Sequence, residues 1–164
     1  MAMISVEHVS LTIGTAQILR DVSAQFEEGQ IHGIVGRNGS GKTMLMKCIC
    51  GFIRPDSGKI FVEGKQVVRD VDFPPDLGLL IETPGFVPYY SGLKNLELLA
   101  AINRRVSKER LNACMEQIGL GDAKNKRVSK YSMGMRQRLG IAQAIMEDPR
   151  LLILDEPLNG LDEQ

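Results

Sequence analysis

The sequence predicts an α/β fold with a helical subdomain inserted between strand-forming segments. Short apolar segments with strand periodicity occur toward both ends of the 164-residue chain. Between them, about fifty residues carry apolar side chains at helical spacing, and glycine-containing turns separate the segments. Because strands come first, helices follow and a strand returns, the pattern favours a mixed α/β protein.

Composition excludes several other classes of protein. Hydrophobic residues make up 43% of the chain and charged residues 24%, as in a globular domain and unlike a disordered chain. Twenty basic residues balance twenty acidic ones, so we expect no nucleic-acid partner. The apolar segments are far shorter than the roughly 18 residues of a membrane-spanning helix, and the N-terminus lacks the pattern of a signal peptide. The three cysteines are expected to be reduced, packed thiols.

The first elements along the chain are expected to be strands. Residues 3–13 alternate apolar and polar side chains, and residues 18–26 do so again, which indicates strands with one buried face. Residues 30–35 form a short, continuous apolar segment that predicts a buried strand leading directly into the glycine-rich segment 36–43.

A helix and a second strand region are expected next. Residues 44–49 are mostly apolar and suit a buried helix that Gly51 ends. Residues 59–62 indicate a strand between a turn at 55–58 and another at 63–65.

The second half of the chain is expected to be mainly helical between two strands. Residues 76–81 and 151–154 are short apolar segments that predict buried strands. Between them, helices are predicted over 93–102, over 107–118 with Ser107 as a possible cap, and over 134–146.

The segment from Gly36 to Thr43 has the G-x-x-x-x-G-K-[ST] spacing of a loop that binds nucleoside-triphosphate phosphates. Glycines let the backbone fold closely around phosphates, so that N–H groups converge at a helix N-terminus. Lys42 would supply a cation for the β- and γ-phosphates, and the Thr43 hydroxyl a ligand for Mg²⁺. A plain glycine-rich surface loop is the alternative, which the position between a predicted strand and helix disfavours. The candidate residues are Gly36, Arg37, Asn38, Gly39, Ser40, Gly41, Lys42 and Thr43.

Two carboxylates follow the last predicted strand. Asp155 and Glu156 come directly after the apolar residues 151–154. At the carboxyl end of a parallel strand, the first carboxylate could hold Mg²⁺ and the second could orient a water against a γ-phosphate. An apolar segment followed by Asp-Glu is weak evidence alone, but the phosphate loop in the same chain makes the pair a candidate site.

The order of these motifs resembles the ATP-binding-cassette (ABC) family. The segment 131–139 (YSMGMRQRL) is similar to the family's signature motif. Residues 155–157 and the following 158–162 (LNGLD) are similar to the segments that come after this motif in the family. Residues 21–23 and 29–31 are similar to the family's leading strands, so the resemblance covers the whole chain. The implied fold is a phosphate-loop NTPase core with an N-terminal antiparallel β subdomain and an inserted helical subdomain.

The resemblance implies a composite site. Ser132 and Gly134 would bind, at a helix N-terminus, the γ-phosphate held by a second, facing nucleotide-binding domain in a homo- or heterodimer. Thr43, Asp155 and Glu82 would ligate Mg²⁺. Glu82 stands where the family has a glutamine, and an exposed acid at a strand end is the alternative interpretation.

The implied function is that of an ATP-binding subunit that hydrolyses MgATP at a dimer interface and drives transport by a membrane permease. Glu156 would be its catalytic residue, and the protein would lie in the cytoplasm on the inner face of the cell membrane, held by the permease. Residues 81–86 are similar to cassettes of bacterial peptide-antibiotic exporters, which favours an exporter. The alternatives are a soluble cassette ATPase of translation or DNA repair, and a non-catalytic truncated remnant.

Besides Glu82, the chain departs from the family pattern at several positions. Met44 replaces a second threonine, and Ile13 stands where an aromatic residue usually stacks on adenine. The family's domain also continues beyond the length of this chain with a further strand and a histidine. We therefore expect residues 1–164 to be one nucleotide-binding domain, incomplete at the C-terminus, with its helical subdomain at about 83–146. Alone, such a chain is expected to fold poorly and not to hydrolyse ATP.

Overall fold

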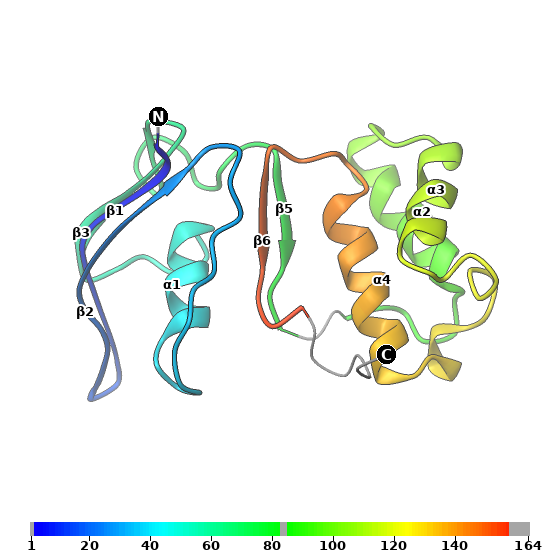
Figure 1. Cartoon of the computed structure of the whole chain (residues 1–164), viewed down its shortest axis with the longest axis horizontal. Coiled ribbons are helices and arrows are strands. Elements are labelled where there is room, and N and C mark those ends of the chain that lie inside the picture. Colours follow the sequence, from blue (N-terminus) through cyan, green and yellow to red (C-terminus); the bar gives the residue numbers. More distant parts are fainter. Residues whose placement is uncertain (1, 83–84, 158–164) are drawn as a thin grey trace. The chain divides into compact units, whose positions relative to one another are not determined.

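The computed structural model describes residues 2–82 and 85–157 (Figure 1). Contacts within the chain divide it into two compact units, Met1–Pro75 and Asp76–Gln164. The described part of the first unit contains an antiparallel sheet and helix α1. That of the second contains a two-stranded parallel sheet and the helices α2, α3 and α4.

The antiparallel sheet of the first unit has the strand order β2-β1-β3-β4. Its strands are β1 (Ala2–Ile13), β2 (Ala16–Glu27), β3 (Ser57–Val62) and β4 (Lys65–Gln66). The first three confirm predicted strands with slightly longer bounds. Strand β4 was not predicted, because a two-residue strand after a turn has no periodicity to detect. Helix α1 (Lys42–Ile49) contacts β2 and β3, which confirms the predicted buried helix.

The pairing of β1 with β2 shifts register at four points, and two successive shifts are β-bulges on opposite strands. At the first, two residues of β1, including His8, lie opposite Ser23; at the second, two residues of β2, including Asp21, lie opposite Ser10. His8 and Asp21 both have left-handed backbones, with φ of 51° and 49°. Their N–H groups donate to the Ser23 and Ser10 hydroxyls, each at 3.0 Å. The Nδ1 atom of His8 lies 2.8 Å from the Asp21 carboxylate, so the two bulges also contact each other.

The predicted strand at residues 30–35 is wrong. These residues have no regular secondary structure, and Ile31 and Val35 are 103% and 95% exposed. A strand needs a partner for its backbone N–H and C=O groups. No described strand pairs with this segment, so its apolar composition alone does not make it a strand. Instead, the His32 ring contacts the Phe26 ring at the end of β2 edge-on, with the two ring centroids 5.4 Å apart.

The parallel sheet of the second unit is formed by β5 (Leu77–Leu80) and β6 (Leu151–Leu154). Both strands were predicted, and they pair in register from Leu77 with Leu151 to Leu80 with Leu154. Helix α4 (Met133–Ile145) packs against this sheet on one side and against α2 and α3 on the other (Figure 1).

The three helices of the second unit confirm the predicted helical segments. They are α2 (Gly92–Asn103), α3 (Lys108–Gln117) and α4, and a short 3₁₀ helix η1 (Val128–Lys130) precedes α4. The N-cap residues Ser91, Ser107 and Ser132 each accept a backbone N–H bond from three residues later. The helices enclose a buried core that includes Leu96, Leu111, Cys114, Met115, Leu120, Tyr131 and Leu139. No helix in the described residues is both long and apolar enough to span a bilayer.

The cysteines confirm the expectation of reduced, packed thiols. Cys48, Cys50 and Cys114 are free and buried. Burial raises the pKa of Cys48 to about 11 and that of Cys50 to about 12, so both are uncharged at neutral pH.

Asn95 fixes the loop that precedes α2, and we expect its removal to destabilise the fold. Its side chain is buried; it accepts from the Val87 N–H (2.8 Å) and donates to the carbonyls of Val87 (3.1 Å) and Ser91 (2.9 Å). Asn95→Ala leaves these groups without their partner, which should cost about 1–3 kcal/mol. Urea unfolding measures this loss. Asn103→Ala, at an exposed position of the same helix, is the control; an equal loss there would contradict the prediction.

Candidate nucleotide-binding site

The phosphate loop connects the irregular segment before Gly36 to the first turn of α1. Gly39 and Gly41 have left-handed backbones, with φ of 79° and 93°. A Cβ at Gly41 would lie 3.1 Å from the Ile18 carbonyl oxygen, and one at Gly36 would lie 2.6 Å from the Ser40 hydroxyl. Gly41 therefore requires glycine, whereas at Gly36 the Ser40 side chain would have to move, and the loop leaves its backbone accessible. The residues at 36–40, which are Gly36, Arg37, Asn38, Gly39 and Ser40, are all exposed.

The charges and donors of this loop suit phosphate groups. The Lys42 ammonium is held by the carbonyl oxygens of Gly36 (2.9 Å) and Arg37 (3.1 Å), so its positive charge lies over the loop. Gly41 caps α1 and has no side chain that could accept from the first helical N–H groups. Those N–H groups and the positive end of the helix dipole form an anion-binding arrangement. Thr43 follows in the same turn and is half-buried.

Three carboxylates lie where the parallel strands end. Glu82 follows β5, and Asp155 and Glu156 follow β6. Asp155 is only 9% exposed, and its N–H donates to the Leu80 carbonyl at 2.7 Å, which extends the pairing one residue past β6. Glu82 and Glu156 each lie two residues beyond the last Cα pair, Leu80 with Leu154, and both have left-handed backbones, with φ of 62° and 45°. Such conformations cost about 1–3 kcal/mol in residues other than glycine and are typical of functional sites.

These carboxylates do not by themselves form a metal site. The described residues contain no group of three or more His, Cys, Asp or Glu side chains placed to hold a metal ion. A bound Mg²⁺ would therefore need ligands from outside this set of carboxylates, such as a threonine hydroxyl or phosphate oxygens.

The start of α4 offers a second anion-binding arrangement. Ser132 is its N-cap, and its hydroxyl accepts the Met135 N–H at 3.2 Å, which leaves the hydroxyl proton available to donate. Gly134 is buried in the first turn. Together with the helix dipole, these groups favour an anion.

One residue at the site was not predicted from the sequence. Gln137, on α4, donates from its side-chain Nε2 to the main-chain carbonyl of Glu156 at 3.1 Å. It lies within the segment 131–139, but a hydrogen bond to a residue 19 positions later leaves no pattern in the sequence.

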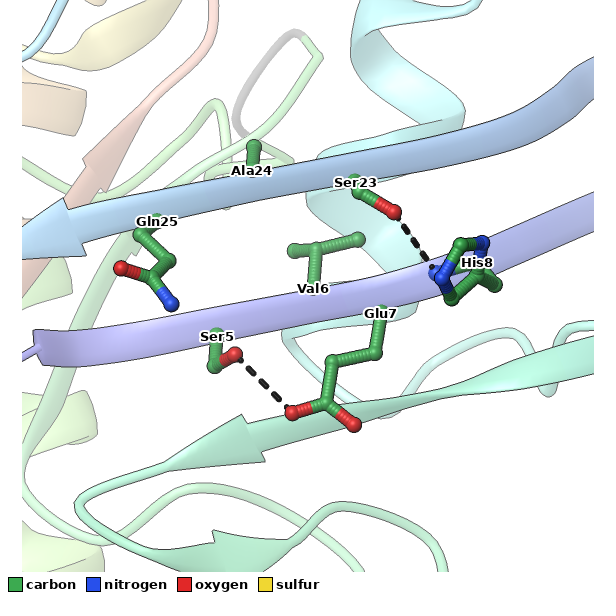
Figure 2. A pocket seen from close by; sticks show the side chains of 7 residues that line it. All are labelled: Ser5, Val6, Glu7, His8, Ser23, Ala24 and Gln25. Carbon is green, nitrogen blue, oxygen red and sulfur yellow. Dashed lines mark hydrogen bonds between the residues drawn. The ribbon is translucent and has the colours of Figure 1, made fainter.

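A shallow pocket of about 360 Å³ lies on the antiparallel sheet, apart from the phosphate loop residues (Figure 2). Its polar side chains are largely engaged with their neighbours: Ser5 donates to Glu7, and Ser23 accepts from the His8 N–H. We assign it no part in nucleotide binding.

The phosphate loop, the strand-end carboxylates and the capped α4 together have the features of an ATP-binding cassette. The model of the ABC transporter family matches residues 19–159, and the chain belongs to this family.

Several bacterial proteins are similar over nearly the whole chain. YdbJ of Bacillus subtilis, an uncharacterized ABC transporter ATP-binding protein, is 44% identical over 98% of this chain and 52% of its own length. YybJ of the same organism is 41% identical over 99% of this chain and 74% of its own. The bacitracin transport ATP-binding protein BcrA of Enterococcus faecalis is 40% identical over 98% of this chain and 52% of its own length. The chain thus spans about half the length of YdbJ and BcrA.

Solved structures confirm the predicted fold class. The dimeric structure of a bacterial ABC transporter cassette matches with a TM-score of 0.84 at 24% identity, over 98% of this chain and 76% of its own. An ATP-binding subunit of an ABC transporter matches with a TM-score of 0.81 at 26% identity, over 98% of this chain and 68% of its own. The predicted loop at 158–162 lies outside the described residues, and the individual roles of the site residues remain predictions.

Proposed function

We propose that the protein containing this chain is the ATP-binding subunit of an ABC exporter, which hydrolyses MgATP to drive a membrane permease. The observation that carries this proposal is the phosphate loop. Its left-handed glycines expose the backbone, and Lys42 holds its charge over that backbone. The family match over residues 19–159 supports the same function.

The residues of the chain have separate tasks in this proposal. The loop residues 36–43 bind the β- and γ-phosphates, and Ile13, which is 46% exposed, provides an aliphatic contact for adenine. Bound Mg²⁺ would supply positive charge to the phosphate oxygens, with Thr43, Asp155 and Glu82 as its protein ligands. Glu156 accepts a proton from the attacking water and orients it toward the γ-phosphate.

A second nucleotide-binding domain completes the site. Ser132 and Gly134 contribute donors at the start of α4 to the γ-phosphate bound by the partner domain. We propose a homo- or heterodimer in which each domain serves its partner's nucleotide in this way.

The relatives support an exporter on the inner face of the cell membrane. Two related proteins carry names for bacitracin transport and lantibiotic transport, at 40% and 34% identity. Both names refer to peptide antibiotics, so we propose that the protein serves export. A permease would hold it at the membrane.

Nucleotide binding is tested by Lys42→Ala. The substitution removes the ammonium that contacts the loop, so MgATP affinity should fall by about tenfold to a hundredfold, equivalent to roughly 1.4–2.8 kcal/mol. Calorimetry on the protein that carries this chain measures the affinity. Lys47→Ala, in the last turn of the same helix, is the matched control. Equal affinities of Lys42→Ala and the parent would rule out the phosphate-loop assignment.

A further inference from the structure

The direction of the Glu156 side chain depends on the main-chain turn that follows β6. Glu156 is exposed and has a φ of 45°, in the left-handed region that residues with a Cβ rarely adopt. The preceding residue, Asp155, is anchored because it is buried and its N–H bonds to Leu80. That bond ends the sheet pairing, and an anchor at the Glu156 carbonyl would hold the turn beyond it.

Gln137 provides this anchor from a rigid element. Its side-chain amide donates to the Glu156 carbonyl oxygen at 3.1 Å. Gln137 is half-buried on α4, and its neighbour on that helix, Leu139, is fully buried in the core of the second unit. The donor is therefore carried by a packed helix, whereas the acceptor belongs to a turn of high conformational energy.

We propose that Gln137 is a positioning residue for ATP hydrolysis: it holds the Glu156 main chain in the conformation that aims the carboxylate at the attacking water. This inference rests on the proposed ATPase function.

The same helix links this carboxylate to the anion-binding groups. Ser132 lies five residues before Gln137, which is roughly 7.5 Å along the axis of an α-helix. An anion that contacts the start of α4 therefore contacts the same short helical segment that holds Glu156. Binding of a partner's γ-phosphate and alignment of Glu156 thus involve one rigid body.

The experiment compares Gln137→Ala and Gln137→Glu with the parent protein. Alanine removes the donor, and glutamate keeps the volume but presents a carboxylate to the carbonyl oxygen. A misplaced catalytic group costs on the order of tenfold to a hundredfold in rate. We therefore expect kcat to fall by at least about tenfold in both variants, with KM for MgATP changed less than about twofold. Gln143→Ala, a half-buried glutamine on the same helix, should leave both constants unchanged.

A second measurement does not depend on activity. Amide hydrogen exchange at Asp155 and Glu156 should be faster in both Gln137 variants than in the parent and in Gln143→Ala. Unchanged exchange, or a kcat within about twofold of the parent, would overturn the inference. If the parent itself turned over no ATP, the proposed function would fail, while the exchange rates would still show whether Gln137 holds this turn. Gln137→Glu keeps the side-chain volume, so the comparison remains possible if the alanine variant unfolds.

Discussion

Replacing Glu156 by glutamine should nearly abolish ATP turnover while MgATP remains bound. Glutamine has the same shape but cannot accept the proton of the attacking water, and removing such a base typically costs about a hundredfold to ten-thousandfold in rate. The phosphate loop is unchanged, so affinity should not fall. Phosphate release under saturating MgATP measures the rate, and calorimetry measures the affinity.

The control for this substitution is Glu147→Gln. Glu147 is an exposed acid just beyond the end of α4, where its carboxylate accepts from Asn103. Its replacement should leave turnover intact. If Glu156→Gln hydrolysed ATP at the parent rate, the base would be a different residue, although the assignment of the phosphate loop would stand.

Replacing Gly78 by valine should strongly destabilise the second unit. Gly78 lies in the middle of β5, and even a Cβ there would come 2.1 Å from the Ala144 carbonyl oxygen and 2.6 Å from the Pro149 ring. Main-chain atoms of a packed helix cannot withdraw as the end of a flexible side chain can. The strand would have to separate from α4, at a cost of about 3 kcal/mol or more, against a total stability of only about 5–15 kcal/mol.

Thermal unfolding followed by circular dichroism tests this prediction. The matched control is Gly33→Ala, since a Cβ at Gly33 meets no atom within 4 Å. A Gly78→Val protein that melts within a few degrees of the parent would show that β5 and α4 can separate at little cost.

Sequence patterns predicted the elements whose causes are local. The serine cap at Ser107 and the glycines of the phosphate loop act within a few residues, and the structure shows both. The strand prediction for residues 30–35 was wrong because an apolar segment becomes a strand only when another strand supplies hydrogen bonds. No local sequence pattern indicates whether such a partner strand is present. Gln137 was missed for a related reason, since its bond to Glu156 forms only after β6 and α4 have packed. Individual roles such as that of Glu82 depend on a bound nucleotide and remain predictions.

The paired bulges of the β1–β2 hairpin determine where this sheet can change in length. At each bulge, one strand carries a residue more than the ladder requires. Deleting His8 would leave Glu7 alone opposite Ser23, so Val6 and Val9 would keep both their partners and their buried faces. Loss of the exposed contact with Asp21 would cost little. A deletion inside the regular part of β1, at Ser5 for example, would instead turn every preceding side chain to the opposite face. Each of these two bulges is therefore a place at which a single codon can be lost without turning the buried side chains of the strand to the opposite face.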